Sequence, residues 1–281
     1  MTAASHPGVL YVVATPIGNL EDITLRALRI LKEVDLVACE DTRRTSLLLH
    51  HFGISTRVQS CHKFNERHRL QSLQEMLQSG KSVALVSDAG TPSLSDPGAL
   101  LVRSCRSSGI PVVSIPGASA VLTALSCSSF AGEPYLFVGF LPASRGKRQK
   151  ALALMKEVPW NLVFYESPLR TAECLQDIHS ILGDRTVFLG RELTKHFEET
   201  LEAPAAQMAA QIAAREIKGE ITLIVKGAVA RESAAEDLPL AVEKARQKIA
   251  AENLSKKEAS RQTAAETGFP AREIYRRLIE S

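Results

Sequence analysis

The chain has 281 residues, of which 45% are hydrophobic and 23% charged, so it is long enough for two α/β domains with separate cores. Mean hydropathy is −0.01 and no apolar run approaches the length of a membrane-spanning helix, so we expect no membrane span. The first residues show neither the basic nor the apolar stretch of a signal peptide. The five cysteines include no Cys-x-x-Cys pair, which argues against a disulfide framework and favours a reducing, cytoplasmic environment.

The net charge of +3 is unevenly distributed along the chain. Residues 1–239 carry 25 basic and 25 acidic residues, whereas residues 240–281 carry 9 and 6. The whole excess therefore lies at the C-terminal end. A second basic run, Arg145-Gly-Lys147-Arg148-Gln-Lys150, lies in the middle of the chain. Localised positive charge of this kind attracts a phosphate backbone.

Up to about residue 227, apolar β-branched runs alternate with amphipathic segments of helical period. The predicted strands are 9–14, 36–39, 82–87, 112–115, 135–140, 162–165, 186–189 and 221–225, and the clearest predicted helices are 25–32, 66–78, 99–107, 171–181 and 205–215. Near-continuous apolar strands predict a mostly parallel sheet with helices on both faces. The turn-rich stretch 128–134 predicts a boundary between two α/β domains, residues 1–130 and 131–228.

The segment 240–281 shows no strand pattern and follows a polar linker at 231–239. We predict helices over 241–253, 256–267 and 271–279. Ser255 is expected to cap the second of these, Gly268 to end it and Pro270 to open the third. Two short helices joined through a glycine turn resemble a helix-turn-helix.

Several common site motifs are absent from the sequence. It contains no Gly-x-Gly, no Walker loop, no His-Glu-x-x-His and no Cys/His cluster with metal-ligand spacing, which argues against nicotinamide, P-loop, zinc or other metal chemistry. Ser119 follows a predicted strand and opens a helix, as a hydrolase nucleophile would. However, the nucleophile motif Gly-x-Ser-x-Gly requires glycine at its fifth position, where this chain has Val121. Helix capping is therefore the favoured role of Ser119, and a hydrolase is a distant alternative.

Four loops rich in turn residues follow predicted strands, at the edge where open α/β sheets bind ligands. They cover residues 14–20, 39–43, 87–98 and 116–120. The third is composed of Ser, Asp, Gly, Thr and Pro except for Ala89 and Leu94. Prolines stiffen such a loop and glycines let its backbone approach a ligand closely, so the four loops together predict a binding site.

Motifs in and beyond these loops resemble one bacterial family. They are LYVVATPIGNLEDIT (10–24), ACEDTR (38–43), HKFNE (62–66), ALVSDAGTPSLSDPG (84–98), IPGASA (115–120), GFLP (139–142), FYESP (164–168), RELTKHFEE (191–199) and KGE (218–220). Over residues 9–227 the chain resembles the ribosomal RNA small subunit methyltransferase I family, of the tetrapyrrole methylase fold group. The C-terminal helices are similar to the helix-turn-helix appended in that family.

The resemblance implies two α/β domains with the cofactor S-adenosylmethionine between them, and a homodimer. It also implies 2′-O-methylation of a cytidine in the decoding region of small-subunit (16S) ribosomal RNA, either naked or in the assembled subunit. A precorrin-type small-molecule methylase and a ribosome-associated RNA-binding factor without chemistry remain the alternatives.

By the same resemblance, the cofactor site is expected to include Pro16, Gly18, Asp88, Ala89, Gly90, Thr91, Pro92, Ser93, Ser119, Ala120, Tyr165, Glu166, Gly219 and Glu220. Related tetrapyrrole methylases carry Gly-Asp-Pro where this chain has Gly90-Thr91-Pro92. Whether Asp88 supplies the missing carboxylate is left open. Phe164 is an additional aromatic wall for adenine, with core packing as the equal alternative.

Methyl transfer to a ribose hydroxyl requires alignment of the reacting groups and removal of a proton. The polar segments 39–43 and 191–199 offer Glu40, Asp41, Arg43, Glu192, Lys195 and Glu199. We expect Asp41, Lys195 and Glu199 to take part in the chemistry, although loop carboxylates are more often solvated or capping. The general base is not identified.

The residues expected to contact RNA phosphates are Arg43, Arg44, Lys63, Arg145, Lys147, Arg148, Lys150, Lys256, Lys257, Arg261, Arg272, Arg276 and Arg277. For the C-terminal ones the alternative is a solvated helix face. His62 and Phe64 are candidates for stacking on unpaired bases, with burial of Phe64 as the alternative.

Overall fold

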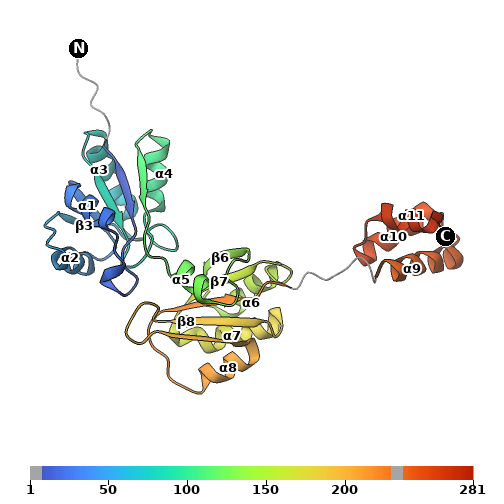
Figure 1. Ribbon diagram of the computed structural model, residues 1–281. Helices are drawn as coiled ribbons and strands as arrows, with labels where there is room; N and C mark the ends of the chain where they lie inside the picture. The colour runs from blue at the N-terminus through green and yellow to red at the C-terminus, as the bar shows by residue number, and fades with distance from the viewer. Residues whose placement is uncertain (1–7, 229–236, 281) are drawn as a thin grey trace, which may run out of the picture. The chain divides into compact units, whose positions relative to one another are not determined.

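The structure, a computed structural model, describes residues 8–228 and 237–280. They belong to two compact units (Figure 1). The first contains two five-stranded sheets and ends at Ala228, and the second contains the C-terminal helices.

The first sheet is parallel throughout, with strand order β3-β2-β4-β1-β5. Its elements are β1 (Leu10–Val13), η1 (Leu20–Asp22), α1 (Leu25–Glu33), β2 (Leu36–Cys39), α2 (Thr42–His51), β3 (Val58–Ser60), α3 (Glu66–Gln78), β4 (Val83–Val86), α4 (Ala99–Ser107) and β5 (Val112–Ile115). Every residue of β2 and β4 is buried, because separate clusters around Leu31 and Leu73 cover the two faces of the sheet. The parallel arrangement brings the carboxyl ends of all five strands to one edge.

The second sheet has the order β6-β7-β10-β8-β9 and is mixed. Its elements are β6 (Tyr135–Phe140), α6 (Arg145–Leu154), β7 (Asn161–Glu166), α7 (Pro168–Leu182), β8 (Thr186–Arg191), β9 (Glu199–Pro204), α8 (Ala205–Ala213) and β10 (Ile221–Val225). Only β6 and β7 pair in parallel, so the prediction of a mostly parallel sheet is wrong for this half of the chain. A central strand buried on both faces shows the same apolar run whichever way its neighbours point.

Helix α5 (Ala120–Cys127) links the two sheets. It follows the first sheet in sequence, yet Val121, Ala124 and Leu125 share one apolar cluster with Val163 and Ile224 of the second sheet. Ile17, from the loop after β1, belongs to the same cluster. Residues from both halves therefore pack together where the loops of the first sheet meet the second sheet.

The C-terminal unit consists of α9 (Asp237–Glu252), α10 (Lys256–Thr267) and α11 (Ala271–Glu280), which confirms the three predicted helices. Ser255 caps α10 in a reciprocal pair with Glu258, and Gly268 ends it in the left-handed conformation. Ala245, Ala259 and Ile274 belong to its small core. Most of the predicted linker, 231–236, lies outside the described residues. None of the described helices is long and apolar enough to cross a membrane.

Candidate active site

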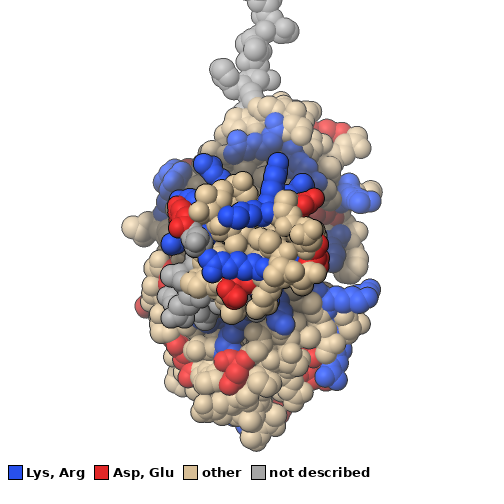
Figure 2. All heavy atoms as spheres, turned by 90° about the vertical axis from the view of Figure 1, so that its right-hand side faces the viewer, with Lys and Arg blue, Asp and Glu red and all other residues tan. Residues whose placement is uncertain are grey.

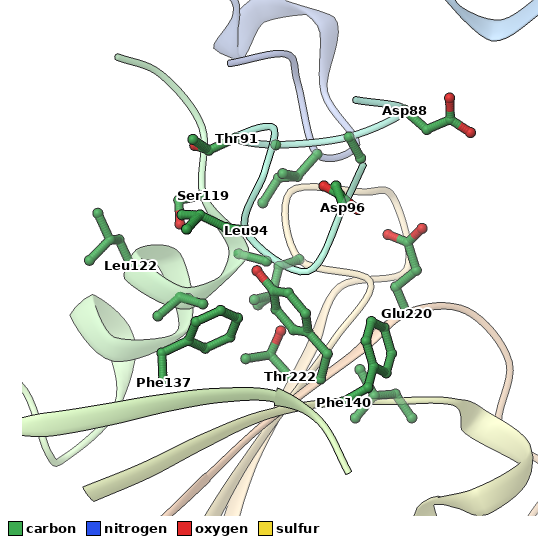
Figure 3. Close-up of a pocket in the computed structure, with 18 of the residues that line it drawn as sticks. Asp88, Thr91, Leu94, Asp96, Ser119, Leu122, Phe137, Phe140, Glu220 and Thr222 are labelled. Atoms are coloured by element: carbon green, nitrogen blue, oxygen red, sulfur yellow. The ribbon is translucent and has the colours of Figure 1, made fainter. Parts of the chain in front are cut away.

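A cavity of about 710 Å³ lies between the loops of the first sheet and strands β6, β7 and β10 of the second (Figure 3). Its apolar wall includes Ile17, Leu94, Leu122, Phe137 and Phe140. Polar groups reach it from the loops after β4 and β5 and from the turn before β10. This is the edge that the four turn-rich loops predict, and its volume is typical of a site for a small organic molecule.

The loop between β4 and α4 forms one side of the cavity and is held in an unusual conformation. Ser93 and Ser95 both have a φ of 70°, a region that non-glycine residues seldom occupy. The loop is tied to the strand-β1 loop because Thr15 and Gly90 exchange backbone hydrogen bonds of 2.9 and 3.0 Å. Backbone strain of this kind persists only where surrounding contacts enforce it, and it is common at functional sites.

The far end of this loop is anchored by Glu66, the first residue of α3. Its carboxylate is buried and accepts hydrogen bonds from the backbone N–H groups of Gly98 (3.1 Å), Leu100 (3.0 Å) and Leu101 (3.3 Å). These N–H groups belong to the start of α4, where a helix leaves its donors unpaired and favours a negative charge. Glu66 therefore fixes the segment that contains Asp96.

Asp96 is the charged residue of the cavity lining that the sequence analysis missed. It lines the cavity together with Asp88 and Glu220, and Figure 3 shows Asp96 and Glu220 on the same side of it. Burial, reinforced by the negative charges of Glu40, Asp88 and Glu220, raises the pKa of Asp96 to about 6 against a hydrogen bond from Ser87. Its sequence, Ser-Asp-Pro-Gly, reads as an ordinary turn, so only the assembled loops give it a role.

Most of the residues expected at the cofactor site line this cavity. They are Asp88, Ala89, Gly90, Thr91, Ser119, Ala120, Tyr165, Glu166, Gly219 and Glu220. Four others, Pro16, Gly18, Pro92 and Ser93, do not line it and lie in its supporting loops. Phe164 is fully buried in the core of the second sheet, so its alternative role as a packing residue holds.

Two of the expected second-sheet residues are constrained by their neighbours. Burial raises the pKa of the Tyr165 hydroxyl to about 12, and its ring packs edge-on against Phe137 at 5.1 Å between centroids. The buried carboxylate of Glu166 accepts hydrogen bonds from Arg170 (2.9 Å) and from the backbone of Ser167 (2.7 Å). Both side chains act as fixed walls.

Lys195 does not line the cavity, but it contacts a residue that does. Its Nζ contacts Glu192 Oε1 at 2.7 Å and Glu220 Oε2 at 3.2 Å, and Glu220 lines the cavity. Burial alone would lower the pKa of Lys195, but the two carboxylates outweigh it and raise that pKa, so the side chain stays an ammonium. A side chain at Gly18 would overlap Lys195, and one at Gly219 would overlap Glu192. These two glycines make room for the ion pairs.

Asp41 caps α2, and Arg43 binds its carboxylate through Nη2 at 2.7 Å and Nε at 3.1 Å. This contact with Arg43 lowers the pKa of Asp41 to about 2, so Asp41 is a poor proton acceptor. Its backbone N–H donates to Asp88 Oδ1 at 3.0 Å, and Arg44 lies 3.6 Å from Asp88 Oδ2. The 39–43 loop thus positions Asp88.

Glu199, expected to take part in the chemistry, is not brought to the cavity. The structure places Glu199 at the start of β9, outside the cavity lining. Its carboxylate is held by Arg215 at 2.8 Å and Arg191 at 2.9 Å, and these contacts lower its pKa. Glu199 ties the end of β8 to the segment after α8.

The structure contradicts the RNA contact expected for Arg148, because that residue is buried. Its side chain is 0% exposed and bonds the buried carboxylate of Asp177 at 2.7 Å, so it is not available to an RNA phosphate. The helical period of α6 turns Arg148 and Leu152 inward and leaves Lys147 and Lys150 exposed.

The other residues expected at RNA are on the surface. They are Arg43, Arg44, Lys63, Arg145, Lys147 and Lys150 in the first unit, and Lys256, Lys257, Arg261, Arg272, Arg276 and Arg277 in the second. Blue Lys and Arg side chains are spread over the face drawn in Figure 2, with red Asp and Glu side chains among them. Arg145 forms an ion pair with Asp177 at 3.2 Å, and Arg276 forms one with Glu273. Within the described residues there is no group of His, Cys, Asp and Glu that could hold a metal ion.

Comparisons with known proteins place the chain in a family. The family described as Tetrapyrrole (Corrin/Porphyrin) Methylases matches residues 9–209. A protein of Escherichia coli O157:H7 named Ribosomal RNA small subunit methyltransferase I is 48% identical over 85% of this chain and 83% of its own length. One of the same name from Halalkalibacterium halodurans is 45% identical over 95% of this chain and 93% of its own. The chain belongs to the ribosomal RNA small subunit methyltransferase I family.

Solved structures show the same fold at lower identity. The uroporphyrin-III C-methyltransferase of Thermus thermophilus complexed with S-adenosyl homocysteine is 20% identical, with a TM-score of 0.55 over 78% of this chain and 97% of that one. The membership and the fold agree that this chain is a methyltransferase built on the tetrapyrrole methylase scaffold.

Proposed function

We propose that the protein transfers a methyl group from S-adenosylmethionine to the 2′-oxygen of a cytidine in the decoding region of small-subunit (16S) ribosomal RNA. The observation that carries the proposal is the cavity at the loop edge of the first sheet, in a chain whose relatives over most of its length are named for that RNA. We assign the chemistry to the domains 1–130 and 131–228, and RNA binding chiefly to residues 240–281.

The cavity has the features that S-adenosylmethionine requires. Its apolar wall suits an adenine ring, and Asp88 and Glu220 offer negative charge to a molecule with a cationic sulfur and an ammonium group. Gly90 has a φ of 76°, and a side chain there would press against Ile17, so the loop needs glycine to keep its backbone at the cavity wall. This open backbone supports the expected cofactor role of the 88–93 loop.

S-adenosylmethionine, when bound, supplies a methyl group activated by the positive charge on its sulfur. The protein must hold the ribose hydroxyl in line and remove its proton. Among the cavity carboxylates, Asp96 suits that task because its pKa of about 6 leaves it ionised at neutral pH yet more basic than an ordinary aspartate. We assign Asp96 Oδ as the acceptor of the hydroxyl proton.

The remaining charged residues act through position. Asp41 holds Asp88 through its backbone, and Lys195 holds Glu220, so each fixes one carboxylate of the cavity. Arg44 lines the cavity and has a partly exposed guanidinium, which suits contact with the phosphate next to the target nucleotide. The substrate is either naked RNA or the assembled small subunit, met in the cytoplasm, and the protein acts as a homodimer.

A deletion strain tests the proposal. Nucleoside mass spectrometry of small-subunit RNA should show one 2′-O-methylcytidine that disappears on deletion and returns with the wild-type gene. Loss of no ribose methylation would contradict the assignment, and transfer of radiolabelled methyl to precorrins rather than to ribosomal subunits would favour the small-molecule alternative.

A further inference from the structure

Phe64 is one of the most exposed large apolar side chains of the described residues, at 94% exposure. It lies between β3 and α3, in the segment 62–66. A phenylalanine ring left in water forgoes the free energy that burial would give it. Single exposed apolar residues are common, so the surroundings of Phe64 decide whether its exposure has a use.

The segment that carries Phe64 is firmly held. The Asn65 side chain accepts from the backbone of His62 at 2.7 Å and donates to Ser60, while the Glu66 backbone donates to the His62 carbonyl at 2.9 Å. The Phe64 backbone donates to His62 Nδ1 at 3.3 Å, and the two rings meet edge-on with centroids 6.1 Å apart. The ring is therefore presented on an ordered turn.

The same segment interacts with two of the loops near the cavity. Glu66, two residues after Phe64, binds the start of α4, which begins shortly after Asp96 in the sequence. Burial and the charge of Asp88 raise the pKa of Glu40, and the nearby His62 partly opposes that rise. Through Glu66, the turn that carries Phe64 is therefore bound to the segment that follows Asp96.

The exposed charged residues on either side of Phe64 in the sequence are basic. They are Lys63 and Arg67, and Arg43 and Arg44 lie at the start of α2, which packs against β3. An exposed aromatic ring among cations is the combination that binds single-stranded nucleic acid, in which bases stack on the ring while phosphates meet the cations.

We propose that Phe64 is a stacking platform for an unpaired base of the RNA substrate, next to the nucleotide that enters the cavity. The inference rests on the proposed function and adds a base-binding site to it. An unpaired base is required because only a base outside a helical stack exposes its face to a side chain. The surrounding cations favour RNA over a second protein surface.

Three variants in the full-length protein test the proposal: Phe64→Ala, Phe64→Leu and Phe64→Trp. The substrate is the small ribosomal subunit purified from a strain that lacks the enzyme. Loss of one stacked base should raise KM for the subunit by about 5- to 100-fold in Phe64→Ala, with kcat changed less than about 3-fold. Phe64→Leu should resemble the alanine variant, and Phe64→Trp should retain wild-type KM.

Leu154→Ala is the matched control, because Leu154 is 86% exposed at the end of α6. It should leave KM unchanged, and all variants should keep the cofactor dissociation constant of the wild type. An unchanged KM in Phe64→Ala would overturn the proposal. So would full activity in Phe64→Leu, since leucine cannot stack, or conversion of the protein to a smaller oligomer, which would mark the ring as a protein contact.

A binding measurement separates this inference from the proposed function. The chain has one tryptophan, Trp160, so Trp160→Phe with Phe64→Trp leaves a single fluorophore at the proposed platform. Its fluorescence should be quenched by a single-stranded oligoribonucleotide, and less by a duplex of the same length. Equal or absent quenching contradicts the platform even where methyl transfer succeeds. Quenching without methyl transfer by the wild-type protein would contradict the proposed function alone.

Discussion

The two sheets bring charged groups to the cavity in different ways. The first is wholly parallel, so its strands deliver every loop to one edge, and Asp88 and Asp96 meet there. The second is mixed, and its charged residues near the cavity are tied up in ion pairs: Glu166 with Arg170, and Lys195 with Glu192 and Glu220. A carboxylate that is buried among like charges has a raised pKa and can accept a proton near neutral pH. An equally polar group that is held in an ion pair serves to position its neighbours.

The strongest test of this division is Asp96→Asn. We expect kcat to fall by about 10²- to 10⁴-fold, because the amide cannot accept the proton, while the cofactor dissociation constant stays within about 2-fold. In the wild type the ionised carboxylate is the active form. The kcat/KM for methyl transfer should therefore rise with pH through about 6 and level off above it.

Glu199→Gln is the matched control from the second sheet. It should lower the melting temperature and leave the pH profile in place, because Glu199 lies outside the cavity lining, where its carboxylate binds Arg191 and Arg215. A pH-independent rate in the wild type, or a larger kcat loss in Glu199→Gln than in Asp96→Asn, would reverse the division between the sheets.

Arg148→Ala tests the scaffold side of the comparison. Removing the guanidinium leaves the buried carboxylate of Asp177 with weaker partners, so the free energy of unfolding should fall by about 3–5 kcal/mol in a denaturant titration. RNA affinity of the folded protein should not change. Lys150→Ala, on the exposed side of the same helix, should behave in the opposite way, with near-normal stability and weaker, salt-sensitive RNA binding.

Sequence reasoning succeeded where local signals were strong. The strands before the turn-rich loops, the Ser255 cap and the Gly268 stop were all predictable because propensity and position agree there. Strand β9 (ETLEAP) was missed because three of its six residues are polar, and its pairing with β8 exists only in the sheet. The direction of β10 was unpredictable for a related reason, since a five-residue buried run does not record which way its neighbours point.

The candidate site followed the same rule. The loops that line the cavity were predictable from their composition, but the properties of their side chains were not. Asp41 and Glu199 look as reactive as Asp96 in the sequence, yet Arg43 and Arg215 lower the pKa of the first two and burial raises that of the third. The partners and the burial of a carboxylate depend on the tertiary structure, and together they set its pKa.

Removal of residues 240–281 extends the comparison to the C-terminal unit. The remaining chain should bind S-adenosylmethionine normally, because the cavity lining lies within residues 17–222. RNA binding should weaken by about ten-fold or more at low salt, and its dependence on salt should become shallower as phosphate contacts are lost. Unchanged affinity for RNA in a filter-binding assay would contradict the role of this unit.

The smallest expected effect is that of Ser255→Ala. Loss of the reciprocal cap with Glu258 should destabilise α10 by about 1 kcal/mol and speed amide exchange along that helix. Methyl transfer should decline only as far as RNA affinity does, and cofactor binding not at all. A loss of cofactor binding would contradict the assignment of the C-terminal unit to RNA alone.

The most direct test of the account is the position of the transferred methyl group. Purified protein is incubated with small ribosomal subunits from a deletion strain and S-adenosylmethionine that carries a trideuteromethyl group, and the RNA is digested and analysed by mass spectrometry. We predict the label on the 2′-oxygen of one cytidine in the decoding region, with Asp96→Asn giving little of it. Label on a base, at scattered riboses, or in no RNA at all would contradict the account.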